Sequence, residues 1–418
     1  MTFFDWHGDQ EQAVGFATYD RDPNAEEVDV KAVRAYRIGR VRAEMAAREI
    51  DACILSDAVN IRYATDTRNM QVFTARNEAS RYLLLTAKEA ILYEFTGCMH
   101  LADGIETITE VRPAITASFV AAGDQIAERE KAWAAAMASD LNALVGPKAT
   151  VGMERLNAGA IIALGAAGFN LVDAQEPLER ARAIKSTEEL KCVRASLRAT
   201  EAGMASLRAA IRPGITENQL WSVMHQAVIA QNGDYCETRL LSSGNRTNPW
   251  FQESSPKVIG ENELVAFDTD VVGCFGYYSD FSRTFHAGPG KPSPAQRDLY
   301  KTAHEQVHYN MGILYPGMSF KEYADAAWNI PEKYHANRYY LSSHGVGMTG
   351  EYPYLYHHAD YADAGYDGIL EPGMTICMES YIGEENGPEG VKLEQQVLIT
   401  ETGIELLSEF PFEEDLMR

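Results

Sequence analysis

Basic residues are scarce in this chain relative to acidic ones. Its 418 residues include 37 Lys and Arg against 60 Asp and Glu, which gives a formal net charge of −23. Such a charge repels phosphate backbones and anionic lipid surfaces, so we expect neither a nucleic acid nor a membrane as a partner. An acidic chain can instead enrich divalent metal ions or positively charged substrates near its surface.

The chain also lacks the patterns of zinc-finger, exported and membrane proteins. Its six cysteines form no CxxC pair, and their scatter indicates free thiols in a reducing compartment. The N-terminus has no basic start followed by an apolar core, and no uninterrupted apolar run reaches about 18 residues. We therefore predict a cytoplasmic protein without a signal peptide or a membrane span.

Helical and strand patterns alternate along the first part of the chain, which predicts an α/β domain. Residues 1–30 are polar and weakly periodic, and we expect them to form an extended arm. A helical pattern follows from Val30 to Ile50, and Asp51–Leu55 is typical of a strand. We predict a first domain over residues 1–185, which includes the arm, and a second, catalytic domain over residues 186–418.

The second domain begins with a helix-start signal and contains a repeated helix end. Ser186 and Glu189 have the spacing of a capping box. Two helices, one after this box and one after Ser293, end in similar Pro-Gly turns at Arg212–Thr216 and Tyr315–Ser319. The similarity indicates an internal duplication, although Pro-Gly turns commonly end helices by themselves.

Acidic residues interrupt apolar strands in this domain. Glu263–Asp270 has a strand pattern in which Asp268 and Asp270 share one face by the two-residue period. A turn with two glycines follows, and a returning strand over Tyr277–Phe285 can bring Asp280 beside them. The hairpin is therefore expected to gather three carboxylates.

Two later strand-like segments carry one glutamate each, Glu379 and Glu394, and His344 lies between the two strand pairs in a predicted glycine-containing loop. Together with the three aspartates, these residues give five carboxylates and one imidazole. Such donors suit divalent Mn, Fe, Co or Zn, and bridging carboxylates can hold two ions about 3.5–4 Å apart. The alternative interpretation makes each acidic residue a solvated surface charge.

The order Asp…Asp, His-Gly-Val-Gly, Glu, Glu resembles the pita-bread metalloenzyme superfamily of methionine aminopeptidases, prolidases, aminopeptidase P and creatinase. The resemblance implies a creatinase-like N-terminal α/β domain followed by a pita-bread catalytic domain with pseudo-two-fold symmetry. Asn60–Asp66, Glu237–Leu241 and Asn248–Glu253 are similar to the superfamily's dimethylsulfoniopropionate lyases, which share the two aspartates flanking Thr269. The resemblance implies two divalent metal ions on Asp268, Asp270, Asp280, His344, Glu379 and Glu394.

The chain departs from the peptidases and from the lyases at particular positions. Trp250 and Gly350 stand where the peptidases carry two further histidines, and Gly350 also replaces the aspartate proposed as the lyases' general base. The remaining candidates for the base are Tyr339, Glu351 and a metal-held hydroxide. Tyr339 matches a pocket tyrosine of the lyases, with simple packing as the alternative, and Glu351 also fits a supporting role.

Aromatic residues cluster around these motifs. We predict that Trp250 and Tyr339 contact the substrate, because aromatic faces attract sulfonium and quaternary ammonium groups. The alternative is that most of these aromatic residues form core or dimer contacts.

Three functions remain open at this point. The first is a metal-dependent lyase that converts dimethylsulfoniopropionate, or a similar small carboxylate, to dimethyl sulfide and acrylate by β-elimination. The second is a metal-dependent hydrolase of a C–N or amide bond, resembling creatinase, ectoine hydrolase or Xaa-Pro dipeptidase. The third is a non-catalytic relative, which the presence of all six ligand positions disfavours. The resemblance also implies a homodimer that acts on a small molecule.

Overall fold

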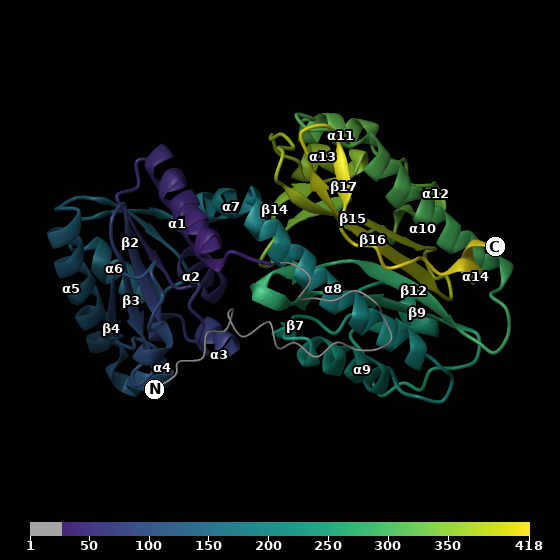
Figure 1. The fold of residues 1–418 in the computed structure, drawn as a ribbon, viewed down its shortest axis with the longest axis horizontal. Coiled ribbons are helices and arrows are strands. Elements are labelled where there is room, and N and C mark those ends of the chain that lie inside the picture. The colour runs from purple at the N-terminus through teal and green to yellow at the C-terminus, as the bar shows by residue number, and fades with distance from the viewer. Residues whose placement is uncertain (1–26) are drawn as a thin grey trace. The chain divides into compact units, whose positions relative to one another are not determined.

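The computed structural model describes residues 27–418, so the predicted arm lies outside the described residues as far as residue 26. The described chain divides mainly into two compact units, Asp29–Arg182 and Ala183–Arg418 (Figure 1). The boundary predicted between residues 185 and 186 lies close to this division. Among the described helices, none combines the length and the apolar character that a membrane crossing requires.

The first unit is a mixed β-sheet flanked by helices (Figure 1). Its strands are β1 (Ala52–Leu55), β2 (Tyr82–Thr86), β3 (Ala90–Glu94), β4 (Glu110–Pro113), β5 (Thr150–Met153) and β6 (Asn170–Asp173). Its helices are α1 (Val30–Ala47), α2 (Ala58–Thr65), α3 (Gln71–Arg76), α4 (Phe119–Ala122), α5 (Ile126–Leu144), α6 (Ala158–Gly165) and α7 (Gln175–Ala183), with short 3₁₀ turns η3 (Glu78–Ser80), η4 (Met99–Ala102) and η5 (Gly123–Gln125).

The strands of this sheet lie in the order β4-β3-β2-β1-β5-β6. β1 pairs antiparallel with β2 and parallel with β5. Both β1 and β2 are buried throughout, as the apolar run of a central strand requires. Trp133 of α5 packs edge-on against Tyr82 of β2, with 5.9 Å between the ring centroids. α1 and β1 confirm the helix and the strand predicted for this part of the sequence.

The described part of the second unit contains three sheets and two helix pairs. Its strands are β7 (Tyr235–Cys236), β8 (Leu241–Ser243), β9 (Glu263–Asp268), β10 (Val271–Val272), β11 (Tyr278–Ser279), β12 (Ser282–Ala287), β13 (Ser343–Val346), β14 (Gly350–Leu355), β15 (Thr375–Gly383), β16 (Gly390–Ile399) and β17 (Ile404–Leu406). Its helices are α8 (Thr187–Ala210), α9 (Glu217–Ala230), α10 (Pro294–Ile313), α11 (Phe320–Ala326), α12 (Glu332–His335), α13 (His358–Ala364) and α14 (Glu414–Met417), with 3₁₀ turns η6 (Gly244–Thr247) and η7 (Cys274–Gly276).

The sheets of the second unit have the orders β14-β13-β15-β16-β17, β12-β9-β8 and β11-β10-β7. α10 packs on β15 and β16, and α8 packs on α9 and β11 (Figure 1). β16 also contacts β9 and β12, which brings the five-stranded sheet against the hairpin that carries the aspartates. Strand ends from two different sheets therefore meet in one region.

Four helices of the second unit begin with the same kind of cap. Ser186, Thr216, Ser293 and Ser319 each begin a helix with a complete capping box, in which side chain and backbone hydrogen-bond reciprocally. Thr216 and Ser319, which follow the two Pro-Gly turns, each also form an isolated antiparallel β-bridge. The pairs α8–α9 and α10–α11 are therefore built alike, as the predicted internal duplication requires.

Candidate metal centre

A hairpin and a sharp turn position the three aspartates. β9 ends at Asp268, which lies opposite Ser282 of β12 in the antiparallel ladder. Asp280 lies between β11 and β12, so the single returning strand predicted for this region was wrong. Asp270 lies beyond β9 in a left-handed conformation with φ of 40°. The predicted strand was therefore too long, because a left-handed residue cannot continue an extended strand.

Two hydroxyl groups hold the Asp270 side chain in this conformation. Tyr278 donates a hydrogen bond to Oδ1 at 3.0 Å, and Thr238 donates a short one to Oδ2. Burial raises the pKa of Asp270 to about 7, and the charge of Asp268 adds to the shift. Left-handed residues of this kind cost about 1–3 kcal/mol and cluster at functional sites.

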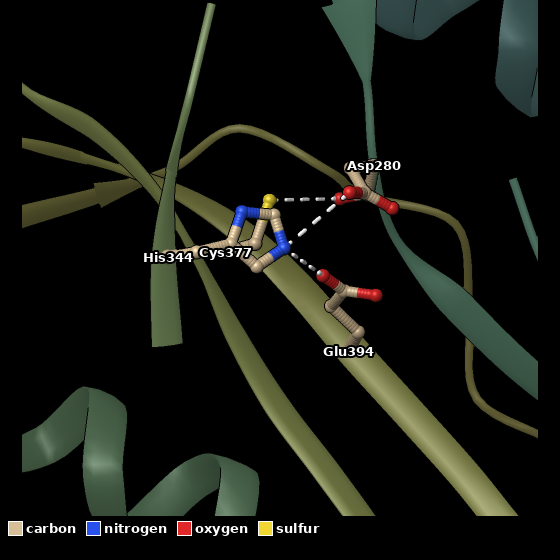
Figure 2. Close-up of side chains that lie close together, drawn as sticks. All are labelled: Asp280, His344, Cys377 and Glu394. Carbon is tan, nitrogen blue, oxygen red and sulfur yellow. Dashed lines mark hydrogen bonds and ion pairs between the residues drawn. The ribbon is translucent and has the colours of Figure 1, made fainter. Parts of the chain in front are cut away.

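The five-stranded sheet supplies the other three predicted ligands. His344 lies in β13 rather than in the predicted loop, next to an irregularity in its pairing with β14. Glu379 of β15 lies directly opposite Glu394 of β16. His344 Nε2 is 3.0 Å from Glu379 Oε1 and 3.6 Å from Glu394 Oε1. It is also 3.5 Å from Asp280 Oδ2, so side chains from two sheets converge (Figure 2).

All six predicted ligands line a single cavity of about 230 Å³. Tyr339 and Gly350, which the sequence analysis also singled out, lie in the same wall. The further lining residues are Glu237, Thr238, Leu240, Phe251, Tyr278, Tyr340, Thr349 and Tyr354. The structure thus brings together the carboxylates and the imidazole, while their role as metal ligands stays a prediction.

The chemistry of this cluster fits a divalent metal centre. Among the described residues, no hydrogen bond reaches Asp280 Oδ1, Glu394 Oε1 or either oxygen of Glu379, although ion-pair contacts with His344 and Lys392 lie near. Burial raises the pKa of Asp280 well above its usual range, and Glu394 adds to the shift. Buried negative charge of this density is unfavourable unless a cation binds, and these donors suit a divalent ion.

Cys377 belongs to the same cluster and was not singled out from the sequence. Its Sγ lies within 4.8 Å of ligand atoms of Asp280, His344 and Glu394 (Figure 2). The thiol donates a hydrogen bond to the backbone carbonyl of Asp280 at 3.4 Å. Burial, followed by the charge of Asp280, raises the pKa of the thiol well above its usual range. The thiol of Cys377 therefore supports the Asp280 backbone through this hydrogen bond.

Two residues predicted to act at the site do not reach the cavity. Trp250 is buried beside Tyr381, with 6.0 Å between the ring centroids, and it is absent from the cavity wall. Its neighbour Phe251 lines the cavity instead. Phe251 has a left-handed φ of 70°. This bend in the chain turns the side chains of Trp250 and Phe251 in different directions. The structure therefore gives no support to substrate contact by Trp250.

Glu351 lies on the face of β14 opposite to the cavity. Gly350 and Tyr354, which share the other face by the two-residue period, both line the cavity. Glu351 Oε1 instead lies 2.5 Å from Lys185 Nζ, and both side chains are buried. Two roles were predicted for Glu351, a catalytic one and, as the alternative, a supporting one. The structure favours the supporting role and gives no evidence for the catalytic one.

An aromatic wall, which we define as Phe251, Tyr339, Tyr340 and Tyr354, forms another side of the cavity. Tyr339 lies 5.3 Å from Phe251 and 4.9 Å from Tyr340 between ring centroids, and Tyr340 lies 6.3 Å from Tyr354. Burial, and then the charge of Glu379, raises the pKa of Tyr339 well above its usual range. The hydroxyl of Tyr339 therefore stays protonated and can donate a hydrogen bond, which disfavours it as a base.

Two charged residues near the site were not recognised from the sequence. Glu237 lines the cavity, and its backbone N–H donates to the Asp270 carbonyl at 2.8 Å. Lys392 lies 2.8 Å from Glu379 and 3.0 Å from Glu394. The sequence did contain a signal for Lys392, because a residue two positions before Glu394 in a strand lies on the same face.

Comparison with known proteins identifies the family. Residues 191–401 match the model of metallopeptidase family M24. The chain belongs to family M24. Residues 37–184 of this M24 protein match the creatinase/prolidase N-terminal domain, which confirms the predicted fold class and superfamily.

Relatives with named functions fall into two groups. The M24 chain is 35% identical over 402 residues to dimethylsulfoniopropionate lyase DddP of Roseobacter denitrificans, and 32% identical over 394 residues to that of Roseovarius nubinhibens. Each match covers 93% of this chain and 88% of the relative. An Xaa-Pro dipeptidase structure from Bacillus anthracis superposes with a TM-score of 0.72 at 21% identity, over 91% of this chain and 99% of that one. The likeness to the dipeptidase shows the fold alone.

Replacing Asp280 tests the ligand set. We expect D280N to lower bound metal from about two ions per chain to less than one, because Asp280 is one of the six predicted ligands and its Oδ2 lies 3.5 Å from His344 Nε2. Metal content is measured by elemental analysis after loading and desalting. D360N, which removes a carboxylate paired with Arg338 outside the cavity, is the control and should keep the wild-type content. Unchanged metal in D280N would contradict the predicted set.

Lowering the pH is expected to destabilise the fold around Tyr339, a residue of the aromatic wall. His357 is buried, its Nε2 lies 3.1 Å from the Tyr339 carbonyl, and burial lowers its pKa from 6.5 to about 4. The unfolded chain therefore binds the proton more readily, so stability falls as pH decreases below about 6.5. Between about pH 7 and pH 5 the wild type should lose roughly 2 kcal/mol more than H357Q.

Urea unfolding at each pH measures this difference. The exposed neighbouring side chain of His358 supplies the matched control, and H358Q should keep the steep loss of the wild type. Parallel curves for the wild type and H357Q would show that His357 does not carry the effect.

Proposed function

We propose that this chain is a metal-dependent lyase that cleaves a small sulfonium or quaternary ammonium carboxylate by β-elimination. Dimethylsulfoniopropionate is the candidate substrate, with dimethyl sulfide and acrylate as products. The observation that carries the proposal is that a single cavity joins the six-residue metal centre to the aromatic wall. The two relatives named as dimethylsulfoniopropionate lyases support it.

The two ends of such a substrate match the two sides of the cavity. A carboxylate would be placed at the metal centre, where a cation neutralises it. The onium group would face the aromatic wall, because ring faces attract cations within about 6 Å of the ring centroid. A cavity of about 230 Å³ suits a small molecule rather than a long peptide.

The reaction needs a base, and position favours Glu237. Bound divalent ions, for which Fe, Mn, Zn and Co are candidates, would acidify the C–H beside the substrate carboxylate. Glu237 lines the cavity and lies outside the predicted ligand set. It would take that proton while the C–H electron pair forms the new C=C bond. The C–S bond breaks with its electron pair going to sulfur, which releases neutral dimethyl sulfide.

A hydrolase of a C–N or amide bond is the second candidate. The family name and the dipeptidase-like fold favour it. It is weakened because Trp250 and Gly350 occupy the positions at which the peptidases carry histidines, as the sequence resemblance implies.

The homodimer and the cytoplasmic location also stay predictions.

Gas detection separates these candidates. Metal-loaded protein supplied with dimethylsulfoniopropionate should release dimethyl sulfide, measured by headspace gas chromatography, whereas D280N and boiled protein should not. The same preparation should leave an Xaa-Pro dipeptide intact. Dipeptide cleavage without gas above the boiled control would reject the lyase and favour the hydrolase.

Removing the carboxylate of Glu237 and then supplying one at position 350 tests whether Glu237 is the base. E237Q should lower turnover by roughly 10²–10⁴-fold with metal content unchanged, because a general base contributes about that much. G350D should then restore part of the turnover in the E237Q background. A Cβ at Gly350 would meet nothing nearer than the His344 ring at 4.0 Å, so a side chain fits there.

G350N in the same background is the matched control, since it fills the same space without a carboxylate. Restoration by both G350D and G350N would show that volume rather than proton transfer matters. Unchanged turnover in E237Q would exclude Glu237 as the base. Strong activation of otherwise wild-type protein by G350D would indicate that the present chain acts on another substrate.

A further inference from the structure

Lys392 is buried completely beneath the candidate metal centre. It lies on β16 two residues before Glu394, on the same face of the strand. Across the ladder it lies opposite Tyr381, diagonal to the Glu379–Glu394 pair. Lys392 is not among the residues that line the cavity, so it contacts the centre from behind.

The ammonium group contacts three of the predicted ligands at once. Its Nζ lies 2.8 Å from Glu379 Oε2, 3.0 Å from Glu394 Oε2 and 3.3 Å from Asp268 Oδ2. It also donates to the Ser282 hydroxyl at 2.9 Å. Each carboxylate therefore turns one oxygen towards Lys392.

The second oxygen of the two glutamates faces the imidazole. Glu379 Oε1 lies 3.0 Å and Glu394 Oε1 lies 3.6 Å from His344 Nε2. Lys392 thus fixes the rotation of both carboxylates about their terminal bonds, and it does so from the side away from the cavity. A charge-assisted contact of this kind is stronger and more directional than a neutral hydrogen bond.

Aromatic rings enclose the ammonium on a further side. Nζ lies 4.9 Å from the centroid of the Tyr339 ring and 5.9 Å from that of Trp250. Trp250, which the sequence assigned to the substrate, therefore contacts this lysine instead. A fully buried ammonium is unfavourable unless it is paired, and here carboxylates and ring faces both compensate its charge.

We propose that Lys392 is the resident counter-charge of the metal centre, which orients Asp268, Glu379 and Glu394 before metal ions bind. The inference rests on the metal centre of the proposed function. Five carboxylates exceed the charge of two divalent ions by one negative charge, and Lys392 supplies the missing positive one. Lys392 is thus a positioning residue that acts through the ligands.

The metal dependence of stability tests this role in the full chain. Without metal, K392M removes the ammonium group from three buried carboxylates, and its apparent Tm should be roughly 5–15 °C below that of metal-free wild type. Added Co²⁺ supplies positive charge to the same carboxylates. It should therefore raise the Tm of K392M by more than it raises the Tm of the wild type.

K185M is the matched control, because Lys185 is also buried and pairs with Glu351 outside the cavity. It should lower the Tm by the same amount with and without Co²⁺. An equal loss in K392M under both conditions would overturn the proposal, since it would make Lys392 a packing residue. A rise from one bound Co²⁺ to two in K392M would also overturn it, because the ammonium would then occupy a metal position.

A double variant keeps the test decisive if metal-free K392M does not fold. E379Q removes one of the negative charges that Lys392 compensates, so K392M/E379Q should be more stable without metal than K392M. Additive losses would contradict the proposal. If the wild type takes up no Co²⁺, the metal centre itself fails and this proposal fails with it. If the wild type takes up Co²⁺ but the losses are additive, only the role of Lys392 fails.

Discussion

The stability of the second unit depends on how the charges of five carboxylates, buried around one cavity, are compensated. Burial raises the pKa of Asp268, Asp270 and Asp280, so the folded chain holds acidic groups in an environment that disfavours their charged form. Glu394 differs, because the nearby Lys392 lowers its pKa despite the opposing effect of burial. Positive charge at this point therefore favours the charged form of the buried carboxylates.

Two-residue alternation in strands separates the groups that face the cavity from those that support it. On β14, Gly350 and Tyr354 face the cavity while Glu351 lies behind and pairs with Lys185. On β13 and β15 the ladder sets His344 opposite Cys377, and cross-strand partners share a face, so both side chains lie in the same cluster. Alternation on β14 therefore places neighbouring residues on opposite sides of the strand, while pairing across strands gathers distant residues on one side.

Much of this arrangement could be predicted from the sequence, and the failures have physical causes. The capping box at Ser186 and the strands carrying Glu379 and Glu394 follow from local patterns, and the structure contains them. Trp250 and Glu351 were misplaced because the side of a chain that faces a cavity depends on register and on left-handed residues such as Phe251. Those features are set by tertiary packing, which no short stretch of sequence specifies.

The predicted metal ligands and the residue at position 350 differ in how the fold holds them. The six predicted ligands are held by buried charge, so a change at one of them disturbs the compensation of the others. Gly350 is exposed at the cavity wall, and a Cβ there would meet the His344 ring at 4.0 Å, so a side chain fits at this position without displacing a predicted ligand. A relative can therefore gain or lose a carboxylate at Gly350 and alter its chemistry without losing its metal centre. The aspartate pair at 268 and 270 is in consequence a better guide to the metal centre of this chain than to its reaction.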